Sequence, residues 1–200
     1  MDVNKNSYTF AFSAILVVVV ASALAFAAES LKPMQKQNVK LEKMQNILAS
    51  VKIEATPEKA QEKFDKYIVK QILLNKDGEV IAPDGLTAFD IDVVKEYKTL
   101  AADNRNYPLF VFEDGGEKKY IVPLAGKGLW GPIWGYMAFN GDMNTVYGST
   151  FDHKTETPGL GANIKQRYFM DDFVGEKLLS ENGDFKGITV AKGNNDPKNL

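Results

Sequence analysis

Residues 126–162 are the most informative stretch of this chain. They begin with Gly126-Lys127-Gly128-Leu129-Trp130-Gly131-Pro132 and end with His153-Lys154-Thr155-Glu156-Thr157-Pro158-Gly159-Leu160-Gly161 and Ala162. Glycines recur along the stretch, and both tryptophans and the only histidine lie inside it. Glycines beside large rings let the main chain approach a flat ligand where a Cβ atom would collide. The composition therefore suggests a cofactor pocket, although glycine-punctuated turns with aromatic side chains in a core would give the same pattern.

A G-x-G-x-x-G pattern begins at Gly126 and matches the fingerprint of dinucleotide-binding βαβ folds. A strand-like run precedes the pattern, and Asp152 follows where a ribose-binding acid could lie. However, Pro132, Gly135 and Gly141 interrupt the next segment, so no helix can point its N-terminus at a pyrophosphate. The segment after the pattern therefore excludes a nicotinamide-binding Rossmann domain.

Composition limits the classes of protein that this chain can belong to. Its 200 residues, 44% of them hydrophobic, suffice for one packed domain plus an anchor. A net charge of -2, with acids and bases interspersed, predicts no nucleic-acid partner. The absence of cysteine excludes disulfides and iron–sulfur ligation, and a single histidine excludes a histidine-rich metal site. A carboxylate site for a hard cation stays open, but we assign no metal ligand.

The segment of residues 8–28 is uncharged and is long enough to cross a membrane. A cleaved signal peptide is the alternative, because Ala23-Leu24-Ala25 and Ala25-Phe26-Ala27 are both small-residue cleavage patterns. The preceding segment carries only Lys5 as a base, and the apolar run is longer than a typical signal core. We therefore expect a retained transmembrane helix.

The periodicity of the remaining chain predicts an α+β fold with one N-terminal transmembrane helix and a single domain of β-hairpins and helices. The expected organisation is a tail and transmembrane helix over residues 1–29, a helical stalk over 30–55 and the domain over 56–200. The predicted elements of the domain are a helix over 57–66, a hairpin of 67–74 with 79–81, a helix over 92–102, a hairpin of 109–112 with 120–124, a helix over 163–178 and a strand over 184–191.

The two quoted motifs, behind a single apolar segment, resemble those of the C subunit of the sodium-translocating NADH:quinone reductase. The G subunit of Rnf-type electron-transport complexes is similar. The resemblance covers essentially the whole chain and implies an FMN protein that carries electrons inside a larger membrane complex. It also implies an ester between the flavin phosphate and a threonine, with the other subunits and the lipid bilayer as partners.

The resemblance implies that both motifs hold the flavin. The cofactor-binding residues that it indicates are Gly128, Leu129, Trp130, Gly131, Glu156, Thr157, Pro158, Gly159, Leu160 and Gly161. Trp130 and Trp134 are able to cover a flavin ring, and the glycines of the second motif can aim amide N–H groups at it. His153 and Glu156 could orient that turn or exchange protons, although a hydrogen-bonded structural role is the simpler interpretation of His153.

One departure from the family concerns the attachment site. The family's threonine ends a Ser-Gly-Ala-Thr motif near the C-terminus, and this sequence has no such tetrapeptide. Gly148-Ser149-Thr150 is the nearest imitation, but it precedes the His153 motif instead of following it. We therefore assign no attachment residue and expect the sequence to stop before the motif. A membrane-tethered binding or assembly module without a redox role stays open.

The orientation of the anchor can be predicted in two ways that disagree. The lysines that follow the span outnumber Lys5 before it, which by the positive-inside rule places the domain in the cytoplasm. The resemblance implies a bacterial inner membrane protein with its domain on the periplasmic side. Large domains are translocated with little regard to nearby lysines, so we expect the periplasmic orientation.

A serine hydrolase is a competing hypothesis, since Ser149, Asp152 and His153 lie close in sequence. Triad members rarely come from one short strand, and no nucleophile elbow surrounds Ser149. We therefore do not favour a hydrolase.

Overall fold

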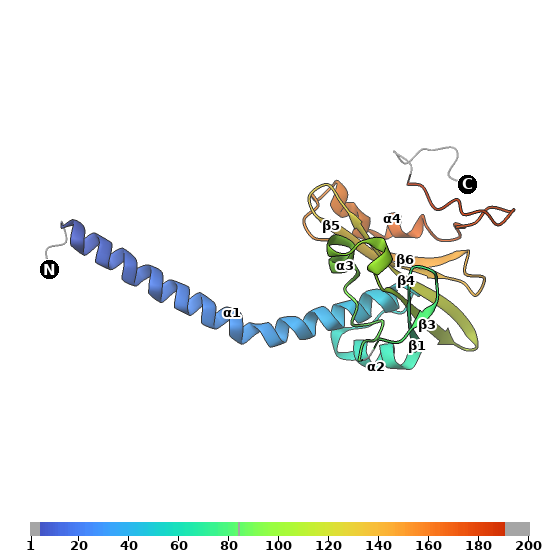
Figure 1. Cartoon of the computed structure of the whole chain (residues 1–200), viewed down its shortest axis with the longest axis horizontal. Coiled ribbons are helices and arrows are strands. Elements are labelled where there is room, and N and C mark those ends of the chain that lie inside the picture. The colour runs from blue at the N-terminus through green and yellow to red at the C-terminus, as the bar shows by residue number, and fades with distance from the viewer. Residues whose placement is uncertain (1–4, 84, 191–200) are drawn as a thin grey trace. The chain divides into compact units, whose positions relative to one another are not determined.

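The computed structural model describes residues 5–83 and 85–190, and the chain forms two compact units, Met1–Lys43 and Met44–Leu200 (Figure 1). The first unit is helical, and the second contains every strand among the described residues. The predicted α+β class, with a long apolar N-terminal helix ahead of a domain of hairpins and helices, is confirmed.

Helix α1, Asn6–Ser50, is a single helix of 45 residues that continues through Pro33. Among the described residues it is the one helix long and apolar enough to cross a membrane, and the span predicted over residues 8–28 lies within it. Its last turns belong to the second unit, where Met44, Ile47 and Leu48 are buried. The segment expected to be a stalk, residues 30–55, therefore ends inside the core of the domain.

The second unit is built on one antiparallel sheet in the order β2-β1-β3-β4-β5-β6. The strands are β1 Ile68–Leu74, β2 Val80–Ile81, β3 Tyr107–Asp114, β4 Glu117–Lys127, β5 Pro132–Phe139 and β6 Val146–His153. Both predicted hairpins, β1 with β2 and β3 with β4, are confirmed. Strands β5 and β6 were not predicted, because Gly135 and Gly148 interrupt the alternation by which a strand is recognised.

The two helices predicted before the second hairpin are also present, with ends that differ by a few residues from the predicted ones. Helix α2, Pro57–Tyr67, begins with its proline at the first helical position, although the Thr56 side chain makes no capping hydrogen bond. Helix α3, Val93–Thr99, is capped by Asp92, whose side chain accepts a hydrogen bond from Lys95 N at 2.9 Å. It ends three residues before its predicted end at residue 102, and a 3-10 turn, η1 Ala102–Asn104, follows.

The helix predicted over residues 163–178 is wrong. The chain forms a 3-10 turn, η2 Gly161–Lys165, and a short helix, α4 Arg167–Asp171, and then runs along β6. Gly175, at φ +90°, donates to Val146 O, and Val146 N donates to Glu176 O, so pairing with β6 replaces the helical bonds. The strand predicted over 184–191 is also wrong in its described part, which has one isolated bridge, Leu179 to Phe185. Ala191 lies outside the described residues.

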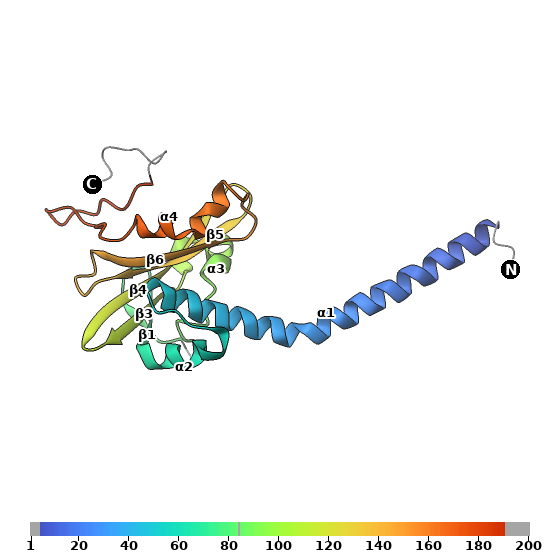
Figure 2. The ribbon, with the colours of Figure 1, turned by 180° about the vertical axis from the view of Figure 1, so that it is seen from behind.

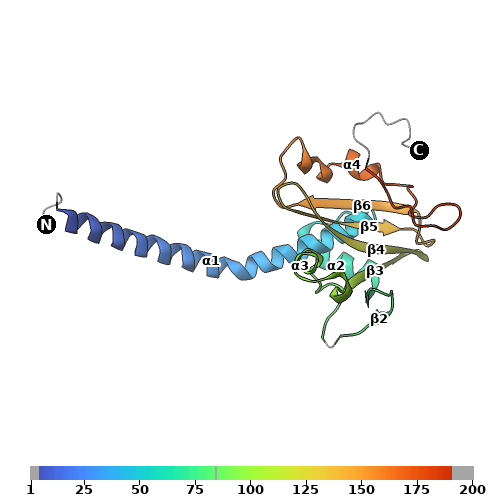
Figure 3. The ribbon, with the colours of Figure 1, turned by 45° about the horizontal axis from the view of Figure 1, so that its top comes forward.

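The sheet has a helical cover on one face and the C-terminal segment on the other (Figures 2 and 3). One register row, Phe110, Ile121, Ala138 and Gly148, crosses four strands and faces α2 and the end of α1. On the opposite face Met137, Phe139, Val146 and Phe173 form a buried cluster, against which Phe151, Phe169, Leu178 and Ile188 pack. Successive residues of a strand point to opposite faces, so each strand contributes to both layers.

Candidate functional site

Two loops meet at one end of the sheet. Residues 128–131 join β4 to β5, and residues 154–160 follow β6. Because β5 and β6 are antiparallel, with Ile133 opposite His153, the start of β5 and the end of β6 lie side by side. Lys154 N donates to Pro132 O at 3.1 Å and extends that pairing. The fold thus brings together the two motifs of the sequence.

The first loop is a tight turn with an apolar tip. Gly128 N donates to Gly131 O at 2.8 Å, and the side chains of Leu129 and Trp130 are 81% and 68% exposed. A Cβ atom at Gly128 would collide with the carboxylate of Glu156, so any side chain there would displace that carboxylate from the loop. The chain then enters β5, which agrees with the exclusion of a Rossmann domain.

Glu156 fastens the first loop to the second. Its carboxylate oxygen Oε1 accepts hydrogen bonds from Trp130 N at 2.8 Å and Gly131 N at 3.2 Å. Its own backbone N donates to His153 Nδ1 at 3.2 Å, and a Cβ atom at Gly161 would lie 2.6 Å from Glu156 Oε2. The residue is only 9% exposed, and hydrogen bonds to an ionised group are among the stronger ones in proteins. We call this set of contacts the Glu156 clasp.

The second loop is a turn closed by the Thr157 carbonyl, which accepts hydrogen bonds from Leu160 N and Ala162 N at 3.1 Å each. Gly159 has φ +77° and no atom within 4 Å of a Cβ built on it. Glycine is therefore required at 159 by backbone conformation. The Leu160 side chain that follows is 73% exposed.

Nine of the ten residues predicted to bind a cofactor belong to these two adjoining loops, and the tenth, Gly161, begins η2 directly after the second loop. Three of them, Leu129, Trp130 and Leu160, present large apolar side chains to solvent from backbones that the Glu156 clasp and the turn hold in place. Exposed apolar groups gathered on a fixed scaffold mark a binding surface, and an indole supplies a flat face for an aromatic ligand. Trp134 lies on β5 opposite Asp152 and is half-buried, four residues after Trp130.

The three residues of the hydrolase hypothesis do not form a triad. The Ser149 hydroxyl donates to Met170 O at 3.1 Å, and His153 Nδ1 accepts from the Glu156 amide. The Asp152 carboxylate is paired with the Lys165 ammonium at 2.9 Å and accepts from His153 N at 2.6 Å. Each side chain is committed to a different partner, so Ser149 has no base. His153 Nδ1 makes the hydrogen bond expected of a structural histidine.

The Asp152–Lys165 ion pair ties β6 to η2 beneath the second loop, and sequence reasoning missed it. No local signal could have found it, since Lys165 was assigned to a regular helix. Within residues 5–83 and 85–190, no group of three or more histidine, cysteine or acidic residues could hold a metal ion.

The fold and the paired loops define a cofactor-binding domain, and residues 128–198 match the FMN-binding domain family. The C subunit of the Na(+)-translocating NADH-quinone reductase of Vibrio campbellii is 32% identical over 89% of this chain and 75% of its own length. The same subunit of the Pseudomonas aeruginosa reductase is 29% identical over 98% of this chain and 82% of its own length. This chain belongs to the family of C subunits of Na(+)-translocating NADH-quinone reductases.

Solved structures agree with that assignment. The crystal structure of the C subunit from Parabacteroides distasonis is 40% identical, with a TM-score of 0.72 over 81% of this chain and 77% of that one. The structure of Shewanella oneidensis NqrC is 26% identical, with a TM-score of 0.64 over 80% and 81%. The family resemblance stated from the two motifs is confirmed.

Proposed function

We propose that this chain is an electron-carrier subunit of a membrane-bound, sodium-translocating NADH:quinone reductase and that FMN is its cofactor. The relatives are named as subunits of that reductase, and residues 128–198 match an FMN-binding domain. The observation that carries the proposal is the pair of loops that the Glu156 clasp holds together while Leu129, Trp130 and Leu160 stay exposed.

When bound, FMN supplies the one-electron redox chemistry, and the residues of the two loops hold and orient it. The Trp130 indole provides a flat apolar face, and Leu129 and Leu160 shield the site from water. The Glu156 carboxylate keeps the backbone of Trp130 and Gly131 in one position, so the loop that carries the indole is held in place before the flavin binds. The threonine ester implied by the resemblance has no assigned residue in this sequence.

Replacing Trp130 with alanine should weaken non-covalent FMN binding by about fivefold, because an aromatic stacking contact contributes about 1 kcal/mol. The measurement is an FMN titration of the full chain in detergent, in the absence of any flavin transferase. Trp134→Phe is the matched control: Trp134 is half-buried within β5, the variant keeps an aromatic ring there, and the dissociation constant should stay unchanged. Equal FMN affinity in wild type and Trp130→Ala would remove Trp130 from the flavin site.

We further propose that α1 is a retained, single-pass anchor in the bacterial inner membrane and that the domain lies on the periplasmic side. The chain has no cysteine, so one introduced thiol reports its own location. In Glu181→Cys, at an exposed turn of the domain, a membrane-impermeant maleimide should label intact spheroplasts. Lys5→Cys, before the apolar segment, should react only after lysis. The reverse labelling pattern would mean that the positive-inside count sets the orientation.

A further inference from the structure

The two edge strands of the sheet differ in how far neighbouring segments cover their outer sides. At the β6 edge, Val146 exchanges backbone hydrogen bonds with Gly175 and Glu176, and Ser149 donates to Met170 O, so the C-terminal segment covers that strand. At the other edge, β2 pairs with β1 only through Leu73 and Leu74. Over residues 68–72, the outer side of β1 has no strand partner within the part of the chain that the structure describes.

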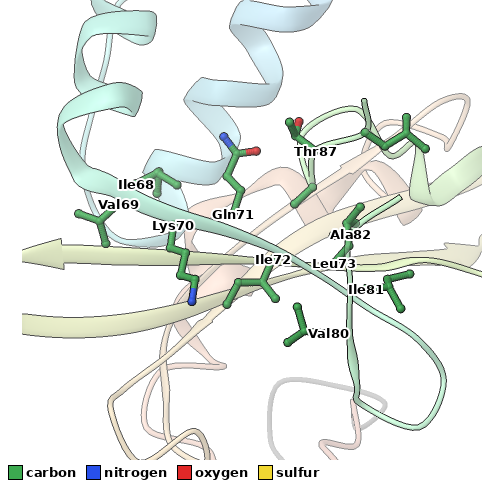
Figure 4. Close-up of a pocket in the computed structure, with 12 residues that line it drawn as sticks. Ile68, Val69, Lys70, Gln71, Ile72, Leu73, Val80, Ile81, Ala82 and Thr87 are labelled. Carbon is green, nitrogen blue, oxygen red and sulfur yellow. The ribbon is translucent and has the colours of Figure 1, made fainter. Parts of the chain in front are cut away.

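A groove of about 430 Å³ runs along this open part of β1. It is lined by residues 68–73 of β1, by residues 80–82 and by residues 86–88, where the chain diverges from the strand (Figure 4). In Figure 4, Lys70 and Ile72 extend from one side of β1 toward Val80, while Gln71 extends from the other side toward the segment of Thr87. Val69 and Val80 are 54% and 71% exposed, so the groove offers apolar contacts as well as open backbone groups.

Lys70 is the only charged side chain among the described residues that line the groove, and it forms no ion pair with a described residue. It is exposed, and the register of β1 against β3 shifts between Ile68 and Lys70. A lysine on an edge strand disfavours pairing with a strand that does not neutralise its charge, and a second copy of this chain is such a strand. Two-fold antiparallel pairing of residues 68–72 would place Lys70 opposite Lys70 of the second copy, which is repulsive.

We propose that the open edge of β1 is a docking site for an extended segment of a partner protein, which adds a strand beside residues 68–72 with an acidic side chain opposite Lys70. Unpaired N–H and C=O groups of a sheet edge are satisfied by another strand. The Lys70 ammonium, which has no ion-pair partner among the described residues, selects an acid on that strand. The exposed Val69 and Val80 contact the apolar side chains of the strand. The docking site lies on β1 and β2 at one edge of the sheet, whereas the flavin loops follow β4 and β6. The inference therefore does not depend on FMN binding.

The test uses the isotopically labelled full chain in detergent micelles and a blocked peptide of sequence Thr-Val-Thr-Glu-Thr-Val-Thr, with a second peptide carrying lysine in place of glutamate. The glutamate peptide should slow hydrogen exchange at the backbone amides of residues 68–72 and bind about tenfold more tightly than the lysine peptide. Lys70→Glu should reverse this preference, and Lys70→Gln should abolish it.

Lys98→Glu is the matched control, because Lys98 is an exposed lysine on α3 that lines no part of the groove. It should leave the preference for the glutamate peptide intact. The proposal is overturned if neither peptide protects residues 68–72, if both bind equally well, or if Lys98→Glu and Lys70→Glu have the same effect. It is also overturned if those amides become protected at high protein concentration without peptide, since the occupant would then be a second copy.

Discussion

Replacing Gly148 with alanine should lower the free energy of unfolding of the domain by about 2–3 kcal/mol, the upper part of the usual range for overpacking a core. A Cβ atom at position 148 would lie 2.5 Å from Ser50 O, and Ser50 is fully buried at the end of α1. Along the register row that faces this helix, the side chains become smaller from Phe110 through Ile121 and Ala138 to Gly148. The backbone of α1 comes closest at Gly148. Any side chain at 148 therefore has to push the end of α1 off the sheet.

The measurement is thermal unfolding of the detergent-solubilised full chain followed by far-UV circular dichroism, where the Tm should fall by about 5–10 °C. Gly126→Ala is the matched control, since a Cβ atom there would meet Ile133 Cγ1 at an ordinary 3.4 Å and the position has no positive φ. Hydrogen exchange should speed up at Ile47 and Leu48 only in Gly148→Ala. Equal Tm values for the two variants would show that the helix does not press on Gly148.

Local signals account for the parts of the fold that the sequence predicted. Asp77-Gly78 and Asp114-Gly115-Gly116 are turn sequences, and Gly78, Gly115 and Gly116 adopt the positive φ that such turns need. Thr56-Pro57 likewise starts α2. These features depend on a few neighbouring residues, so they can be recognised without knowledge of the tertiary contacts.

The parts that were missed depend on contacts between distant residues. Gly135 and Gly148 look like strand breakers, yet each is required because the neighbouring backbone occupies the space of a side chain. Residues 163–178 have a helical pattern, but burial of Phe173 against Met137 and the pairing of Gly175 with Val146 override it. Helix propensity is weak enough for such tertiary contacts to decide the outcome.

In the candidate site, too, some features have a local sequence signal and others depend on contacts between distant residues. The glycines and the exposed Trp130 could be singled out because their residue types are unusual at that spacing. The adjacency of the two motifs could not, because it depends on the antiparallel pairing of β5 with β6, two strands that the sequence did not reveal. The role of Glu156 follows only from that pairing, since its hydrogen-bond partners lie 25 and 26 residues earlier in the chain.

Replacing Glu156 with alanine should reduce the FMN bound per chain by more than about tenfold at sub-saturating FMN, measured on the detergent-solubilised full chain without a flavin transferase, because both loops lose their common attachment. The part-buried Trp130 and Gly131 amides would lose their acceptor, and a hydrogen bond to a charged group contributes about 1.5–3 kcal/mol. Glu156→Gln keeps an acceptor oxygen in the same place. It should therefore retain most of the bound FMN while losing the charge-assisted part of the two hydrogen bonds.

A spectroscopic readout separates loss of the clasp from general unfolding. In a Trp134→Phe background Trp130 is the only tryptophan, so its fluorescence anisotropy reports the order of the first loop. The Glu156→Ala change should lower that anisotropy, whereas Glu156→Gln should leave it close to the parent value. Unchanged far-UV circular dichroism would show that the sheet persists in both variants. If Glu156→Ala keeps both the FMN content and the Trp130 anisotropy of its parent, the carboxylate does not position the flavin loops.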